Sequence, residues 1–337
     1  MGVFINVLFL QKKKKVSLEK YQHLFSSFLE GNKQKEEPKG LYSPISYILQ
    51  LGGKRLRPLL TLMATDAFGN DPKEALSAAL SVEIFHNFTL MHDDIMDAAP
   101  LRRGKTTVHE KWNTNTGILS GDAMLIQAYQ CLEMYEDPLY AKLNKQLSKT
   151  ALEVCEGQQY DVDFETQTTV SISAYLEMIK LKTAVLVGYA LKAGAWIGNA
   201  SDQEAEKLYD FGVLLGLAFQ IQDDYLDAYG DPKDFGKQLG GDIIENKKTI
   251  LYHKAMELGS SEEKKSLVEW FDFVGNKQDK VFAVKAIFDS TGAARASQQL
   301  VSEYTQLAFD KLAEIQISDK GKSTFKTFGN NLMERKF

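Results

Sequence analysis

Residues 73–97 read KEALSAALSVEIFHNFTLMHDDIMD. Apolar residues fall on nearly every side of the helix that this stretch predicts, which is typical of a helix in the centre of a protein. Its end is different, because Asp93, Asp94 and Asp97 fall within five positions. On a helix Asp93 and Asp97 lie one turn apart on one face, where like charges repel by a few tenths of a kcal/mol. A positive group between them would offset that repulsion.

Two arginines follow these acids in HDDIMDAAPLRRG, residues 92–104. Arg102 and Arg103 indicate that whatever binds between the aspartates also brings negative charge. A divalent cation that carries a phosphorylated ligand satisfies both halves, since carboxylates bind the cation and guanidinium groups bind phosphate oxygens.

The same acid spacing occurs again in FQIQDDYLD, residues 219–227. Its acids are Asp223, Asp224 and Asp227, and Asp223 follows Asp93 by 223 − 93 = 130 positions. A single such motif is weak evidence, because solvated helix faces often carry acids. Two copies on apolar helices are more specific, since unpaired buried charge is costly. If the two helices face each other, the acids line a cleft that suits Mg²⁺.

Basic residues accompany both motifs, often next to glycines that let the backbone approach a ligand closely. They are Lys54 and Arg57 in GGKRLRP, Arg102 and Arg103, Lys182 with Thr183 beside it, and Lys237 and Lys247 around the loop after the second motif. Each alone is more often a surface charge, but their placement as a set indicates an anion site. No P-loop and no GxGxxG occurs, which excludes the usual nucleotide-binding motifs.

Composition limits the function classes. The chain has 337 residues, 44% of them hydrophobic, and only seven prolines, which favours helix. A net charge of −5 argues against nucleic acid as a partner, because binding the phosphate backbone requires a basic face. Two cysteines form neither a CxxC pair nor a disulfide framework, which fits a reducing, cytoplasmic location.

Helical periodicity extends outward from residues 73–97 in both directions. Before them we expect a helix ending at Gly31, a charged linker, a helix from about Ser43 to Gly52 and another from Pro58 to Phe68. After them we expect helices at roughly 114–136, 138–165, 171–198 and 202–229, and further helices from Lys247. No strand alternation is long enough to build a sheet. The prediction is one all-α domain over residues 17–337.

The N-terminal stretch MGVFINVLFL is apolar, but lysines follow it instead of preceding it, unlike a secretory signal. Some ten apolar residues are too few to cross a bilayer, so we expect no membrane span. A weak contact with a membrane surface remains an alternative. The favoured interpretation is an irregular leader over residues 1–16.

The motifs taken in order resemble those of trans-prenyl diphosphate synthases, the family of farnesyl and geranylgeranyl diphosphate synthases. They are GGKRLRP, HNFTLMHDDIMD, LRRGK, GDAML, GQQYD, LKTA, FQIQDDYLD and GDPKDFGK. The resemblance covers roughly residues 40–250. It implies antiparallel helices around a deep cavity, and a homodimer.

The resemblance also implies a Mg²⁺-dependent head-to-tail condensation. Isopentenyl diphosphate would add to an allylic diphosphate (dimethylallyl, geranyl or farnesyl) with release of pyrophosphate. Asp93, Asp97 and Asp223 would hold Mg²⁺. Three ions would be present with substrate bound, and Mn²⁺ could replace them. Asp94 and Asp224 would complete the catalytic acid motifs.

The family positions divide the remaining residues into three sets. The residues matching contacts to the allylic diphosphate are Arg102, Lys182, Lys237 and Lys247. Those matching the isopentenyl diphosphate site are Lys54, Arg57, His86 and Arg103. Thr183 and Gln220 match oxygen-bearing residues beside the developing allylic cation.

Two alternatives belong to other classes. A terpene cyclase is also an all-α Mg²⁺ enzyme, but cyclases usually carry a mixed Asn/Ser/Glu motif where this chain has DDYLD, and they lack GGKRLRP. A non-catalytic subunit of a heteromeric synthase tends to lose an acid motif or the basic site, and both are intact here.

Side chains one and two turns before Asp93 bear on product length. Phe88 lies five residues before Asp93, Thr89 four and Phe85 eight. An aromatic residue five positions before the first aspartate resembles the pattern of short-chain enzymes of the family. Animal-type farnesyl synthases also have an aromatic residue four positions before it, so Thr89 departs from them and leaves more space for the product. We therefore expect a twenty-carbon product, with fifteen carbons as the alternative. A core-packing role for Phe88 is the other interpretation.

Overall fold

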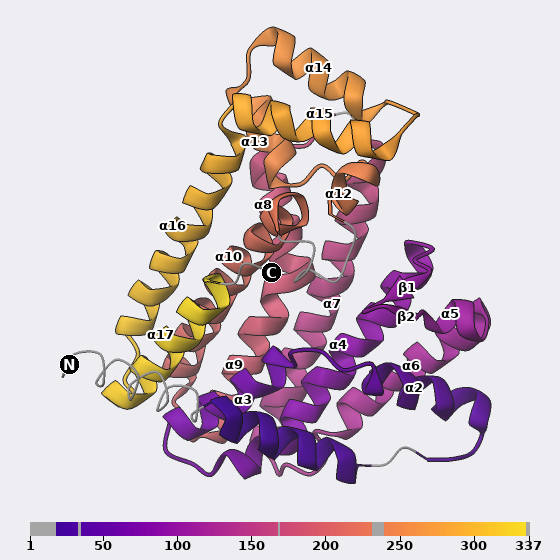
Figure 1. Ribbon diagram of the computed structural model, residues 1–337. Helices are drawn as coiled ribbons and strands as arrows, with labels where there is room; N and C mark the ends of the chain where they lie inside the picture. The colour runs from indigo at the N-terminus through magenta and orange to yellow at the C-terminus, as the bar shows by residue number, and fades with distance from the viewer. Residues whose placement is uncertain (1–17, 33–34, 168, 231–238, 335–337) are drawn as a thin grey trace, which may run out of the picture. The chain divides into compact units, whose positions relative to one another are not determined.

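The computed structural model describes residues 18–32, 35–167, 169–230 and 239–334, which are helical apart from turns, loops and one short hairpin (Figure 1). The predicted all-α fold is confirmed. The predicted leader, residues 1–16, and Lys237 lie outside the described residues.

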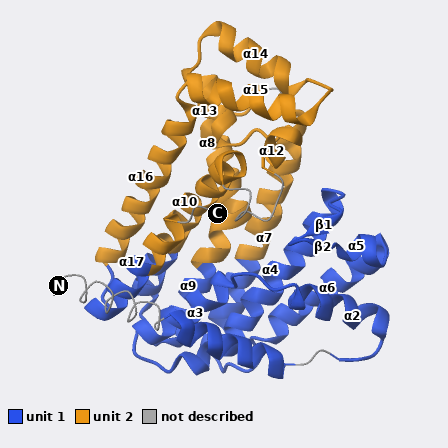
Figure 2. Ribbon diagram, in the orientation of Figure 1, with its two compact units in different colours: residues 1–149, 189–209, 315–327 blue, residues 150–188, 210–314, 328–337 orange. Residues whose placement is uncertain are grey.

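The chain divides into two compact units, which we call the first and the second unit (Figure 2). The first comprises residues 1–149, 189–209 and 315–327, and the second residues 150–188, 210–314 and 328–337. Four of the five boundaries fall inside helices, and the fifth falls between residues 314 and 315, outside any helix. The four helices are α7 (Leu139–Thr166), α9 (Val185–Ile197), α10 (Asp202–Tyr229) and α17 (Asp319–Met333).

The first unit is built around α4 (Leu76–Met96), which packs against α3 and α6. Every residue from Ala78 to Phe85 is buried, as expected for a helix with apolar residues on all sides. The other elements of this unit are a helix at 18–31, α2 (Lys39–Gln50), α3 (Leu56–Ala67), the 3₁₀ turn η1 (Pro72–Ala75), β1 (Leu101–Arg102), β2 (Lys105–Thr106), α5 (Val108–Lys111) and α6 (Thr114–Gln130).

Two glycines let α6 approach the end of α4. A Cβ atom at Gly121 would lie 2.1 Å from His92 Nε2, and one at Gly117 would lie 2.8 Å from Ile95 Cδ1. Because His92 and Ile95 flank the first aspartates, these glycines fix where the motif sits against α6.

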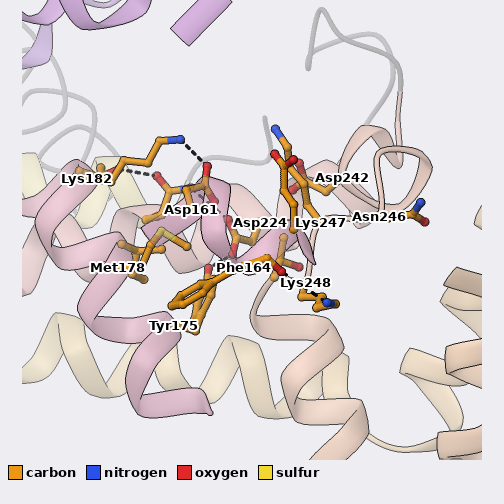
Figure 3. Close-up of a pocket in the computed structure, with 15 residues that line it drawn as sticks. Asp161, Phe164, Tyr175, Met178, Lys182, Asp224, Asp242, Asn246, Lys247 and Lys248 are labelled. Carbon is orange, nitrogen blue, oxygen red and sulfur yellow. Dashed lines mark hydrogen bonds and ion pairs between the residues drawn. The ribbon is translucent and has the colours of Figure 1, made fainter. Parts of the chain in front are cut away.

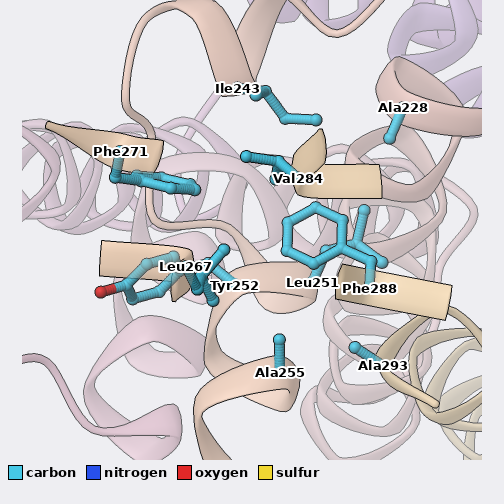
Figure 4. Close-up of a cluster of buried hydrophobic side chains, with 10 residues drawn as sticks. All are labelled: Ala228, Ile243, Leu251, Tyr252, Ala255, Leu267, Phe271, Val284, Phe288 and Ala293. Carbon is cyan, nitrogen blue, oxygen red and sulfur yellow. The ribbon is translucent and has the colours of Figure 1, made fainter. Parts of the chain in front are cut away.

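The second unit has its own hydrophobic cluster, to which Leu251, Leu267, Val284 and Phe288 contribute (Figure 4). These residues come from α13, α14 and α15, and Figure 1 shows α14 and α15 lying side by side. The elements of this unit are α8 (Ile172–Ile179), the π-helical turn η2 (Lys180–Ala184), α12 (Gly241–Ile244), α13 (Ile250–Leu258), α14 (Ser261–Phe271), α15 (Lys277–Ser290) and α16 (Ala293–Ala313).

Some predicted helix bounds were wrong. We expected one helix to start near Ser43, but α2 begins at Lys39 and carries Pro44 in its second turn. The helix accepts the loss of the one hydrogen bond that the missing proline N–H would make. The helix expected at 171–198 contains the π turn η2, and the one expected at 114–136 ends as α6 at Gln130.

Among the described residues, no helix combines the length and apolar character needed to cross a membrane.

Candidate active site

The first aspartate motif ends α4, and its three acids have different surroundings. Asp93 is half-buried, Asp94 is buried and Asp97 is exposed at the C-cap. Asp94 Oδ1 accepts hydrogen bonds from Arg102 Nε and Nη2, both at 2.7 Å. Burial raises the pKa of Asp94, and the Arg102 guanidinium opposes that rise.

A two-residue hairpin carries the arginines. β1 pairs with β2 in the register Leu101↔Thr106, and Arg103 and Gly104 between them both have positive φ, at 53° and 71°. Positive φ at both central residues is the geometry of a type I′ turn. The adjacent arginines take different partners, since Arg103 Nη1 donates to the carbonyl of Gly52 while Arg102 binds Asp94.

The GGKRLRP segment, residues 52–58, forms the loop before α3 and the first three residues of that helix. Gly52 and Gly53 have φ of 78° and 126°, and a Cβ atom at Gly53 would lie 2.7 Å from the Arg103 guanidinium. The positive φ favours glycine at position 53, and a side chain there would displace the Arg103 guanidinium. Lys54 is exposed.

Arg57 and His86 are brought together, as their shared assignment predicts. Arg57 Nη1 lies 3.1 Å from His86 Nε2. Burial, and then the nearby positive charges with Arg57 foremost, hold the pKa of His86 well below its usual range. A neutral imidazole can accept the hydrogen bond that Arg57 donates, which orients the guanidinium.

Sequence reasoning missed Glu83, which lies on α4 one turn before His86. Its carboxylate is buried and accepts a hydrogen bond of 3.2 Å from Asn87 Nδ2, and Arg55 Nε lies 4.0 Å away. Burial raises the pKa of Glu83, and its arginine neighbours oppose the rise. A lone Glu on an apolar helix was the signal that could have found it.

The second aspartate motif borders a pocket of about 150 Å³ in the second unit (Figure 3). Five of its lining residues were predicted for the site, and the others were not. The predicted lining residues are Lys182, Thr183, Gln220, Asp224 and Lys247, and the unpredicted ones include Asp161, Tyr175, Asp242, Asn246 and Lys248.

A chain of hydrogen bonds crosses this pocket. Thr183 Oγ1 donates to Gln220 Oε1 at 3.1 Å, and Gln220 Nε2 donates to Asp224 Oδ1 at 3.0 Å. Asp224 also accepts from the Tyr175 hydroxyl and from the Ile250 N–H. These donors are neutral, and burial raises the pKa of Asp224 to about 7.

Lys182 lies on the π turn and pairs with Asp161 on α7 at 2.6 Å. A Cβ atom at Gly157 would lie 2.2 Å from the Lys182 backbone nitrogen, so this glycine lets α7 and the π turn touch. Asp161 is the last residue of the GQQYD motif, and the sequence alone did not indicate a role for it. Single π turns are frequent at functional sites.

Asp242 and residues 246–249 complete the pocket rim, and Asp227 holds Asp242 from outside the pocket lining. Asp227 is buried, and its carboxylate accepts the Asp242 N–H at 3.0 Å. Lys247 pairs with Glu245 at 3.1 Å, and Lys248 donates to the carbonyls of Phe164 and Gln167. Asp223, the first acid of the motif, is half-buried.

The residues expected to set product length lie together on α4. Phe88 makes edge contacts with Phe85 and His92, with ring centroids 5.6 and 4.9 Å apart. Thr89 Oγ1 donates to the His86 carbonyl at 2.8 Å. Phe85 is fully buried and Phe88 half-buried, so Phe88 is the better placed of the two to contact a ligand.

The predicted site residues thus form two groups, one in each unit. Asp93, Asp94 and Asp97 share the first unit with Lys54, Arg57, His86, Arg102 and Arg103, and Asp223 and Asp224 share the second with Lys182, Thr183, Gln220 and Lys247. Within the described part of the chain, no group of three His, Cys, Asp or Glu side chains is arranged to hold a metal by itself.

Comparison with known proteins identifies the family of the chain. Residues 38–290 match the family model for polyprenyl synthetase. A curated geranylgeranyl pyrophosphate synthase of Geoglobus acetivorans is 37% identical over 84% of this chain and 87% of its own length. A short chain isoprenyl diphosphate synthase of Methanothermobacter thermautotrophicus is 34% identical over 90% of this chain and 93% of its own.

A solved geranylgeranyl pyrophosphate synthase is 52% identical, covers 95% of this chain and 99% of its own, and has a TM-score of 0.92. Proteins of this family bind diphosphate through divalent metal, and the related synthases use isopentenyl and allylic diphosphates. The predicted prenyltransferase, a short-chain prenyl diphosphate synthase, is therefore confirmed. The chain belongs to the polyprenyl synthetase family.

Proposed function

We propose that the protein condenses isopentenyl diphosphate with an allylic diphosphate, releases pyrophosphate, and makes geranylgeranyl diphosphate as its main product. Farnesyl diphosphate is the alternative product. The names of the relatives support the twenty-carbon product, and so does the aromatic Phe88 followed by the smaller Thr89.

The observation that carries the proposal is the pairing of each aspartate motif with its own basic group. In the first unit Arg102 and Arg103 accompany the acids, and in the second Lys182 and Lys247 line the pocket beside Asp224. Acids for a metal and cations for a diphosphate are the two requirements of this chemistry.

The carboxylates fit Mg²⁺. Asp97 is exposed and Asp93 and Asp223 are half-buried, whereas Asp94 is paired with Arg102. Mg²⁺ takes one or two carboxylates and fills its other positions with water and phosphate oxygens, so no three-carboxylate cluster is needed. We assign it to Asp93, Asp97 and Asp223, expect three ions with substrate bound, and expect Mn²⁺ to substitute. When bound, the metal neutralises the diphosphate as it leaves.

The chain's own residues would divide the two substrates. Arg102, Lys182, Lys237 and Lys247 would bind the allylic diphosphate, and Lys54, Arg57, His86 and Arg103 the isopentenyl diphosphate. Thr183 and Gln220 would turn oxygen atoms towards the positive charge that develops on the allylic carbon. Because these oxygens are already hydrogen-bonded to each other, they need little reorganisation when that charge develops.

We also propose a homodimer in the cytoplasm, with residues 17–337 acting as one catalytic domain. The reducing environment inferred from the cysteines supports the location. Light scattering of the purified protein tests the oligomeric state.

The test of the reaction is turnover by the purified chain with isopentenyl diphosphate and, separately, dimethylallyl, geranyl and farnesyl diphosphate. We expect Mg²⁺-dependent consumption of isopentenyl diphosphate and a twenty-carbon prenyl diphosphate, and no turnover with excess EDTA. Cyclic hydrocarbons released from an allylic diphosphate alone would favour the terpene cyclase. No turnover without a second chain would favour the non-catalytic subunit.

A further inference from the structure

Lys280 is a buried lysine outside the predicted site. It lies on α15, and its side chain is 5% exposed. Its ammonium donates to two neutral oxygens, Asn246 Oδ1 and, at 2.9 Å, the Phe271 carbonyl. Burial lowers the pKa of Lys280, which means that burying its charge is costly.

The partner Asn246 holds an unusual backbone position. Its φ is 60°, in the left-handed region where glycine is preferred. The Asn246 N–H bonds to the Ile243 carbonyl at 3.3 Å, and the Lys247 N–H bonds to the Asp242 carbonyl at 2.8 Å. This pair of bonds is the Schellman motif that ends α12, with Asn246 as its left-handed residue.

The Schellman motif belongs to the pocket rim. Asp242, Asn246 and Lys247 all line the pocket, and Figure 3 shows them at one side of it. The start of α12 is already tied to the second aspartate motif, because Asp227 accepts the Asp242 N–H and its carbonyl accepts the Gly240 N–H. Lys280 ties the other end of α12 to α15.

We propose that Lys280 is a positioning residue that acts through Asn246 to hold Lys247 in place for a diphosphate. Lys280 itself does not line the pocket. A methionine at this position would bury a similar stem without the cost of the charge, so the ammonium has a role that packing alone does not explain. This role rests on the proposed function, because it assumes that the pocket binds the allylic diphosphate.

Asn246→Gly is the decisive variant. Glycine keeps the left-handed conformation and relieves its strain, but it removes the oxygen that Lys280 holds. Asn246 is exposed, so the change opens no cavity in the core. If Asn246 serves the turn alone, the variant binds as the wild type does. If it serves Lys280, we expect the KM for the allylic diphosphate to rise roughly 10- to 100-fold, with little change in the KM for isopentenyl diphosphate.

Lys280→Met should give the same split between the two KM values, and the double variant should be no worse than the worse single one. Lys277→Met is the matched control, since Lys277 is exposed on the same helix. Calorimetry with inorganic pyrophosphate and Mg²⁺ gives a second readout, in which both site variants should bind more weakly than the control.

Two failures can be told apart. If the wild type does not turn over isopentenyl diphosphate, the proposed function fails. If the wild type turns over but Asn246→Gly leaves both KM values and pyrophosphate binding unchanged, the positioning role is overturned. A fall in melting temperature with unchanged KM values would also overturn it, and Asn246→Gly decides the question even if Lys280→Met does not fold.

Discussion

The two aspartate motifs have the same spacing, yet the middle aspartate of each is bound differently. Asp94 pairs with the Arg102 guanidinium, whereas Asp224 accepts hydrogen bonds from neutral donors, among them Tyr175 and Gln220. Burial raises both pKa values, but only Asp94 has a charged partner that opposes the rise by direct contact. The motif sequence alone therefore does not determine whether its middle aspartate is ionised.

The last aspartates differ as well. Asp97 is exposed at the end of α4, while Asp227 is buried and accepts the Asp242 N–H. Only the first aspartates, Asp93 and Asp223, are alike, since both are half-buried. The first position of the motif is therefore half-buried in both copies, whereas the middle and last positions differ in their partners or in their exposure.

The largest expected effect is at that shared position. Asp93→Ala and Asp223→Ala should each lower turnover by roughly 10²–10³-fold or more, because a lost metal ligand removes stabilisation of the leaving diphosphate. Circular dichroism should be unchanged, since neither side chain is in the core. Wild-type turnover in either folded variant would contradict the assignment of both motifs to metal.

The basic groups should separate the two substrates. Arg57→Ala should raise the KM for isopentenyl diphosphate roughly 10- to 100-fold, which corresponds to about 1.5–3 kcal/mol for a charged hydrogen bond. Lys182→Ala should act mainly on the allylic diphosphate. Steady-state kinetics with each substrate varied in turn measures both.

Equal effects on the two substrates in either variant would show that the division is wrong. Because Lys182 pairs with Asp161, Asp161→Asn is the matched control. It should act on the same substrate as Lys182→Ala but more weakly, since the ammonium remains.

The motif helices differ five residues before their first aspartate, where one has Phe88 and the other Ala218, and we expect Phe88 to limit product length. Phe88→Ala should lengthen the product by about one isoprene unit or more, since it removes a ring that contacts Phe85 and His92. Chromatography of the dephosphorylated products measures this.

Gly121→Ala tests the position of Phe88 indirectly, because the added methyl group would push His92 against the Phe88 ring. Gly117→Ala on the same helix is the control, since it meets Ile95 instead. An unchanged product length in Phe88→Ala would show that another residue limits product length.

The last aspartates should differ in stability. Asp227→Ala should lower the free energy of unfolding by about 0.5–2 kcal/mol, the range for losing a side chain that caps a helix start. Asp97→Ala should leave it unchanged, because Asp97 is exposed. Urea unfolding of both variants measures the difference, and equal stabilities would mean that the Asp227 contact contributes nothing.

Much of this molecule was predictable from local pattern. The buried run from Ala78 to Phe85 follows from its apolar sequence. Arg57 and His86, which only the family resemblance assigns to one substrate, lie in contact, and that assignment stays a prediction. Helix ends depended on competing local preferences, which is why α2 begins four residues before Ser43.

Residues whose role comes only from tertiary contacts were missed. Tyr175 and Lys280 look like ordinary helix residues in the sequence, because nothing local to either shows that Asp224 or Asn246 lies beside it. The π turn at Lys182 was missed for the same reason, since it depends on the close approach of Gly157 from α7.

The smallest expected effect concerns the proton on Asp224. Its folded-state pKa is raised to about 7, above the ordinary value near 3.8, so the folded protein holds this proton more tightly than the unfolded chain. Folding is then favoured while the group is protonated in both states, and this contribution to the free energy of unfolding is lost as the pH rises from about 4 towards 7.

Asn at this position cannot ionise. Measured by urea unfolding in EDTA, the stability of the wild type relative to Asp224→Asn should therefore decline across that window. Asp94→Asn is the comparison variant, because it replaces the carboxylate that pairs with the Arg102 guanidinium. Burial raises the pKa of Asp94 too, so the wild type should lose stability relative to this variant in the same direction as the pH rises, with the guanidinium opposing the decline. A constant difference between wild type and Asp224→Asn from pH 4 to pH 7 would mean that the folded-state pKa of Asp224 is not raised, and that its neutral donors offset the cost of burying the carboxylate.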